Sequence, residues 1–134
     1  MSSDVIKLGP NQTLFVREST PDVLAMEAEW QPGSTEPPPH YHPNQDEHFE
    51  VLEGELTVIT GDEERRVLRA GDAIDIPREL VHRMWNTSEG VTRASWRITP
   101  ALKSEEMFRT IASGGREDFL EAFADEFRFP GPPA

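Results

Sequence analysis

The sequence predicts an all-β domain, a sandwich or a barrel, followed by one or two C-terminal helices. Across the first hundred residues, short segments of β-forming side chains alternate with turn residues such as Gly54, Gly61 and Gly71. About eight or nine short strands at such spacing are typical of sandwiches and barrels. The strands that we expect cover residues 13–18, 23–30, 47–53, 55–60, 64–69, 73–77, 81–87 and 91–98.

The pattern changes toward the end of the chain, where apolar residues recur at helical spacing. Ser104, followed by two glutamates, predicts the capped start of a first helix, which Gly114 and Gly115 then end. A second helix is expected over residues 117–127. Its apolar stripe consists of Phe119, Leu120, Phe123, Ala124 and Phe127.

Composition excludes several classes of protein. A chain of 134 residues makes one domain, and its net charge of −12 argues against binding to nucleic acid. No apolar run approaches the length of a membrane span, and the N-terminal residues lack the pattern of a signal peptide. Because cysteine is absent, there is no thiolate metal site and no disulfide. We therefore expect a cytoplasmic protein that binds neither nucleic acid nor a membrane.

Three histidines and one glutamate form a pattern that is typical of a metal-binding site. His40 and His42 are two residues apart, which places both rings on one face of an extended chain. Glu47 opens an apolar-rich strand, and His82 lies on a later strand. Three imidazoles and one carboxylate suit Fe(II), Mn(II), Ni(II), Cu(II) or Zn(II). We predict that these four residues ligate a divalent transition metal ion.

The spacing of these residues resembles the first motif of the cupin superfamily. That motif is a glycine followed by His-x-His, a glutamate and a closing glycine, and Gly33, His40, His42, Glu47 and Gly54 match it. Four residues separate His42 from Glu47, and six separate Glu47 from Gly54, which suits the motif. The interval from Gly33 to His40 is one residue longer than the usual form.

A second cupin motif, Gly-x5-Pro-x-Gly-x2-His-x3-Asn, is similar to the stretch that holds Gly71, Pro77, His82 and Asn86. Glu79 stands where this motif has its middle glycine, which places the turn there in question. The resemblance implies a jelly-roll barrel, also called a double-stranded β-helix, with the metal inside. It divides the chain into a cupin β-barrel domain of residues 1–100 and a C-terminal helical extension of residues 101–134.

Strand alternation decides which side chains face the interior. If Glu47 points inward, Phe49 points inward with it, whereas His48 points outward. His48 is therefore the competing ligand, because a slip of one residue exchanges the two faces. The same alternation on other strands nominates an apolar substrate pocket. Its expected members are Met26, Trp30, Phe49, Met84 and Trp96.

The resemblance to small metal-binding cupins implies a metal-dependent dioxygenase or related oxidoreductase acting on a small organic molecule, with Fe(II) or Mn(II) favoured. Glu47 would serve as ligand and, if it detaches from the ion, as the general base for a substrate hydroxyl. A non-catalytic module that binds a small molecule or a metal is the alternative, as is a metal-dependent isomerase or decarboxylase.

Two expectations concern assembly and the C-terminal extension. Single-barrel cupins commonly pair, so we expect a homodimer. We expect the extension to dock on the outside of the barrel or on a second subunit. Truncation after Ala101 should therefore reduce stability more than metal affinity.

Overall fold

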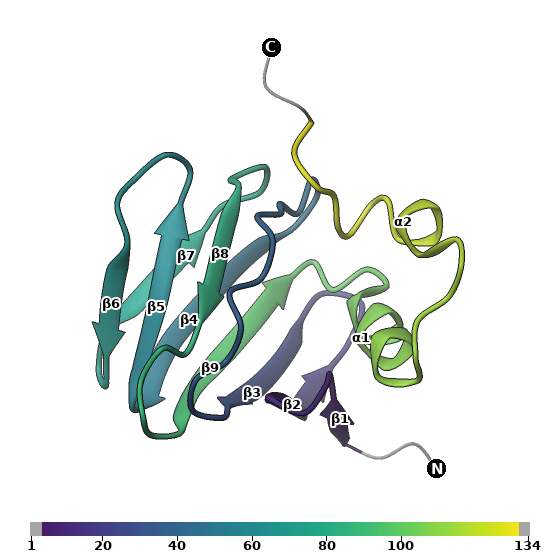
Figure 1. The fold of residues 1–134 in the computed structure, drawn as a ribbon. Coiled ribbons are helices and arrows are strands. Elements are labelled where there is room, and N and C mark those ends of the chain that lie inside the picture. The colour runs from purple at the N-terminus through teal and green to yellow at the C-terminus, as the bar shows by residue number, and fades with distance from the viewer. Residues whose placement is uncertain (1–3, 132–134) are drawn as a thin grey trace.

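The computed structural model describes residues 4–131, and within them two β-sheets form a jelly roll with helices at one side (Figure 1). The larger sheet has the strand order β1-β2-β3-β9-β4-β7, and the smaller has the order β6-β5-β8. The strands are β1 (Val5–Lys7), β2 (Gln12–Ser19), β3 (Leu24–Trp30), β4 (Asp46–Glu53), β5 (Glu55–Thr60), β6 (Arg66–Arg69), β7 (Ala73–Ile76), β8 (His82–Trp85) and β9 (Thr92–Thr99).

The predicted all-β jelly roll with C-terminal helices is confirmed. Each strand that we expected is present, with ends that differ by a few residues. Strand β1, which the sequence pattern did not predict, has three residues and pairs with β2, with Ile6 opposite Leu14. A strand of that length is too short for its alternation of apolar and polar side chains to stand out.

Alternating side chains from both sheets fill the core. On β4, Glu47, Phe49 and Val51 are buried, whereas His48 and Glu50 face away from the core. On β9, Trp96 is buried opposite Phe49, and the two rings stack with centroids 5.0 Å apart. The inward orientation predicted for Glu47 is therefore confirmed.

The C-terminal helices differ from the prediction in two respects. Helix α1 (Ser104–Ala112) begins after Lys103, and no side chain caps it. The buried hydroxyl of Ser104 instead accepts a hydrogen bond of 2.7 Å from the Gln45 side chain. Helix α2 (Phe119–Ala122) is much shorter than expected. The chain beyond it runs alongside the segment before β4, where Arg128 pairs with Tyr41.

Residues 101–134 do not form a separate unit in the part that the structure describes. Met107 and Phe108 of α1, together with Phe123 after α2, are buried in the same hydrophobic core as the strands. Both helices lie at the same side of the sheets (Figure 1). No helix among the described residues is long and apolar enough to cross a membrane.

Gly54 occupies the tightest turn of the barrel. Its φ is +80°, and a Cβ atom built there would lie 2.5 Å from the carbonyl oxygen of Val91. No side chain fits this space without moving the backbone of the neighbouring segment. The closing glycine of the first motif is thus a packing requirement.

Glu79 keeps the turn that leads into β8, although it is not a glycine. Its φ is +73°, in the left-handed region, where a Cβ atom costs about 1–2 kcal/mol. Its N–H donates a 2.9 Å hydrogen bond to the carbonyl of His42, and the N–H of Leu80 donates to the carbonyl of Pro77. The turn therefore holds the two histidine-bearing segments together while its backbone is strained.

We expect Glu79→Gly to raise the free energy of unfolding by up to about 1 kcal/mol. Relief of the left-handed strain exceeds the entropy that a glycine adds to the unfolded chain, which is about 0.5–1 kcal/mol. Urea denaturation of metal-free protein measures the change. Glu89→Gly is the matched control, because Glu89 is exposed and is not among the described residues with positive φ; it should not stabilise. A Glu79→Gly variant less stable than the parent would contradict the assignment of strain.

Candidate metal centre

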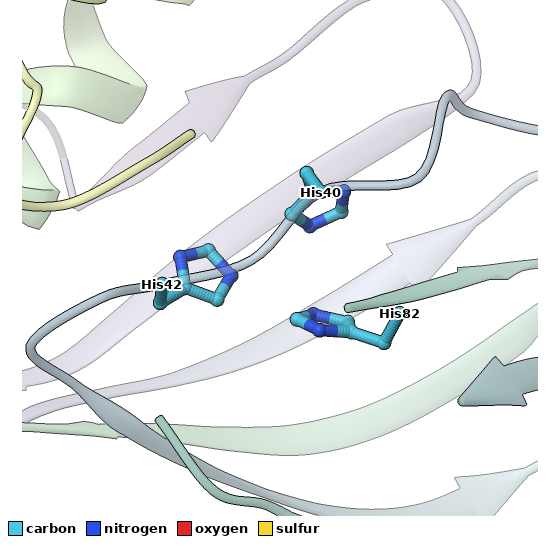
Figure 2. Close-up of side chains that lie close together, drawn as sticks. All are labelled: His40, His42 and His82. Carbon is cyan, nitrogen blue, oxygen red and sulfur yellow. The ribbon is translucent and has the colours of Figure 1, made fainter. Parts of the chain in front are cut away.

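Both sheets and the segment before β4 contribute to the predicted metal site. Glu47 lies on β4 of the larger sheet, and His82 lies on β8 of the smaller one. His40 pairs with His82 through two backbone hydrogen bonds of 3.2 and 2.9 Å. One ring nitrogen from each of His40, His42 and His82 lies within 4.8 Å of the others. Figure 2 shows the three rings converging from two separate segments.

Each of the three imidazoles is held by a backbone carbonyl on its Nδ1 side. The Nδ1 atom of His40 lies 3.2 Å from the carbonyl oxygen of Pro38, that of His42 lies 2.7 Å from that of Glu126, and that of His82 lies 2.9 Å from that of Leu80. A carbonyl only accepts, so each Nδ1 donates its proton. Each Nε2 is left with a free lone pair, which is the tautomer that metal-binding histidines use.

Glu47 completes the site from the opposite wall. Its Oε1 lies 3.0 Å from Nε2 of His42 and 3.1 Å from Nε2 of His82, and its Oε2 accepts a 2.7 Å hydrogen bond from Trp96. Two ligand atoms at about 2.1 Å from one ion, at right angles, are about 3.0 Å apart. The observed separations therefore fit ligands that share an ion.

Two buried donor atoms of the site make no hydrogen bond to the rest of the described structure: Nε2 of His42 and Oε1 of Glu47, which lie 3.0 Å from each other. Two buried oxygens away from the site, Oε1 of Gln45 and Oε1 of Glu126, also lack a hydrogen bond. Buried polar atoms are nearly always satisfied, and leaving one unpaired costs about 1–3 kcal/mol. A transition metal ion would satisfy both donor atoms of the site at once, so the donor set fits the ion that the cupin motifs imply.

The pKa values reflect how the carboxylate and the imidazoles act on one another. Burial alone would raise the pKa of Glu47, but the imidazoles of His42 and His82 hold that pKa far below its usual range. Burial would lower the pKa of His42, and the carboxylate of Glu47 outweighs it and raises that pKa. Burial, with His82 and His42, lowers the pKa of His40 to about 4. At neutral pH the site thus offers an ionised carboxylate and a neutral His40 imidazole.

His48, the competing ligand, lies on the outer face of β4. Its Nδ1 is 2.7 Å from a carboxylate oxygen of Asp75, and 44% of its side chain is exposed. Asp46 also faces outward, where it pairs with Arg78 at 3.1 Å. The structure therefore brings Glu47 to the three histidines and keeps His48 away from them.

A cavity of about 430 Å³ opens beside the metal site. Four of the predicted pocket residues line it, whereas Met26 is packed in the core and does not. The four are Trp30, Phe49, Met84 and Trp96. Three side chains of α1 also line the cavity, as does Phe127, and none of these four was predicted to belong to the pocket. The three are Met107, Phe108 and Ile111.

The C-terminal strap, which we define as residues 125–128, is part of the site. Tyr41 and Arg128 exchange two backbone hydrogen bonds of 2.9 and 3.0 Å, so the strap runs beside the segment that carries two of the histidines. Phe127 stacks on the His40 ring with centroids 4.9 Å apart. The carbonyl of Glu126 holds His42. The extension was expected to dock on the outside of the barrel or on a second subunit; the structure adds that its strap contacts two predicted ligands, His40 and His42.

A comparison with protein families matches residues 26–97, more than half of the chain, to the family described as "Cupin domain". Among curated proteins, YdbB of Bacillus subtilis, described as uncharacterized, is 52% identical over 44 residues, which are 33% of this chain and 39% of that protein. Oxidoreductase iacF of Pestalotiopsis fici is 31% identical over 94 residues, 65% of this chain and 43% of that protein. The chain thus spans less than half the length of these relatives.

Solved structures share the architecture. KdgF from a Halomonas species superimposes with a TM-score of 0.67 at 22% identity, over 76% of this chain and 92% of that one. An oxalate oxidase superimposes with a TM-score of 0.59 at 25% identity, over 75% of this chain and 59% of that one. The likeness to KdgF, at 22% identity, shows a shared fold and nothing further.

Removal of the C-terminal strap should weaken metal binding. A chain that ends at Ala124 lacks the Glu126 carbonyl and the Phe127 ring, and loss of such supporting contacts typically lowers metal affinity about 10–100-fold. Competition with a chromophoric chelator measures the affinity. A chain that ends at Pro130 keeps the strap and should bind as the full chain does. If the longer deletion unfolds, Phe127→Ala tests the ring alone. Unchanged affinity in a folded strap variant would refute the supporting role.

Proposed function

Because the chain belongs to the cupin family, we propose that it is a metal-dependent oxidoreductase, of the dioxygenase type, that acts on a small organic molecule. The observation that carries this proposal is the buried set of three imidazoles and one carboxylate beside an apolar cavity. The oxidoreductase name of the relative iacF and the likeness to oxalate oxidase support it.

In this proposal His40, His42, His82 and Glu47 hold a divalent ion, Fe(II) or Mn(II) before Ni, Cu or Zn. Such an ion, when bound, supplies Lewis-acid and redox chemistry at an oxygen of the substrate. The chain itself orients the donors: three carbonyls fix the imidazoles, and Trp96 fixes the carboxylate through Oε2.

The side chains around the donors have two further roles. The apolar walls exclude water from the site, which strengthens each electrostatic interaction inside it. Glu47 is ionised, and its Oε1 faces the histidines while Oε2 is occupied by Trp96. If the carboxylate leaves the ion, Oε1 is the atom that would accept a proton from a substrate hydroxyl. A binding module without turnover, an isomerase and a decarboxylase are the competing outcomes.

Metal analysis is the first test. The protein is purified without added metal and without a nickel column, and its metal content is measured by mass spectrometry. We expect iron or manganese at close to one ion per chain. Oxygen uptake with candidate substrates then separates an oxidoreductase from a binding module. The proposal would be wrong if the protein binds no metal after exposure to Fe(II), Mn(II), Ni(II), Cu(II) and Zn(II).

Single substitutions test the ligand set. His82→Ala should abolish metal binding or weaken it at least 100-fold, because it removes a donor from the interior while most of the barrel's packing remains. His48→Ala is the matched control and should leave metal content unchanged, since its ring pairs with Asp75 outside the barrel. Calorimetric titration of each variant measures the affinity. The ligand set is wrong if His48→Ala empties the site.

Glu47→Gln should separate binding from chemistry. The amide keeps an oxygen near the histidines but removes the charge that offsets a divalent cation. It also removes the proton acceptor. We therefore expect activity to fall further than metal content does, when both are measured on the same preparation. Full activity in a metal-loaded Glu47→Gln variant would exclude Glu47 as the base.

A further inference from the structure

The walls of the cavity are apolar and carry no cation. Among the described residues that line it there is no lysine or arginine, and apart from the four predicted ligands Gln12 is the polar side chain. Much of the wall is aromatic or sulfur-containing: Trp30, Met84, Trp96, Met107, Phe108 and Phe127. The indole N–H of Trp96 already donates to Glu47, so it is not free for a substrate.

The arginines next to these wall residues in sequence are engaged elsewhere. Arg83 follows His82 and pairs with Glu36. Arg109 follows Phe108 and donates to Glu105 at 2.9 Å, within its own helix. Arg128 follows Phe127 and donates to a backbone carbonyl at 2.7 Å. These arginines are therefore neighbours of cavity-lining residues in sequence, but their guanidinium groups bind other partners and do not line the cavity.

Such walls discriminate strongly between substrates. An ionised group that enters the cavity away from the histidines loses its water and meets no counter-charge, which is among the most unfavourable changes in binding. A flat apolar body gains contact with aromatic faces, as the existing packing shows: Trp96 stacks on Phe49, and Phe108 meets Trp96 edge to face at 5.2 Å.

We propose that the site takes a neutral molecule with an apolar, ring-bearing body and an oxygen at the end that reaches the histidines. Dicarboxylates and phosphate esters are then disfavoured because a charged group must enter the apolar part of the cavity, and sugar acids because their hydroxyl groups find few partners there. Only the placement of the oxygen rests on the proposed function. The preference for an apolar body follows from the cavity walls and holds with or without metal.

Two probes that share the same hydroxynaphthalene body test the preference. The first is 2-naphthol; the second is 6-hydroxynaphthalene-2-sulfonate, which has the same hydroxyl and a charge at the far end. Binding to EDTA-treated protein is measured by calorimetry. We expect 2-naphthol to bind at least tenfold more tightly than the sulfonate. Equal affinities, or tighter binding of the sulfonate, would overturn the proposal.

A substitution at the rim gives a gain of binding. Ile111 borders the cavity and is 36% exposed, so a longer polar side chain fits there without disturbing the core. Ile111→Lys should bind the sulfonate at least fivefold more tightly than the parent does, because an ammonium now faces the charged end. Ile111→Gln is the uncharged control and should show no such gain. A sulfonate affinity that Ile111→Lys does not increase would contradict the proposal, provided that circular dichroism shows the variant folded.

Repeating the titrations after metal loading separates the two proposals. Tighter binding of 2-naphthol to the loaded protein supports both. Preference for 2-naphthol with no effect of metal supports the apolar substrate class and contradicts the placement of its oxygen at the metal. A metal effect without any preference supports the metal site and overturns the substrate class.

Discussion

The arrangement of the candidate site depends on the buried carboxylate of Glu47. Glu47 is 3% exposed, and an ionised carboxylate in such surroundings is stable only when its charge is compensated. One of its oxygens is satisfied by the indole of Trp96, while the other faces His42 and His82 without a hydrogen bond. The jelly roll supplies this arrangement because β4 and β8 belong to different sheets and face each other across the interior.

The imidazoles are held by main-chain carbonyls from three separate segments, so the site depends on the tertiary fold rather than on one local motif. Glu126 shows the coupling most directly. Its carbonyl holds His42, and its buried carboxylate accepts a hydrogen bond from the backbone N–H of Lys103, at the start of α1. A carboxylate is favoured there by the helix dipole. One residue thus joins the first helix of the extension to a predicted ligand inside the barrel.

What the sequence predicted correctly depends on local pattern. Alternation along β4 placed Glu47 inside and His48 outside, since a strand that buries one face admits only one register. Contacts made by the main chain have no residue signature, so the role of the Glu126 carbonyl was not predictable. The apolar stripe that ends at Phe127 indicated burial but not a position beside His40. Ser104 resembled a helix cap, but its hydroxyl accepts a hydrogen bond from Gln45, 59 residues away in the chain, and local pattern does not reveal such a contact.

Charge outside the cavity and charge inside it favour the same chemistry. The net charge of −12 produces a field that concentrates cations near the surface and repels anions. A metal ion is therefore attracted to the protein, whereas an anionic substrate is opposed first by this field and then by a cavity wall without lysine or arginine among its described residues. A neutral apolar molecule experiences neither barrier and gains the contact area of the aromatic walls. In the proposed function the acidic surface and the apolar interior act together: the surface attracts the ion, and the interior selects the molecule that binds beside it.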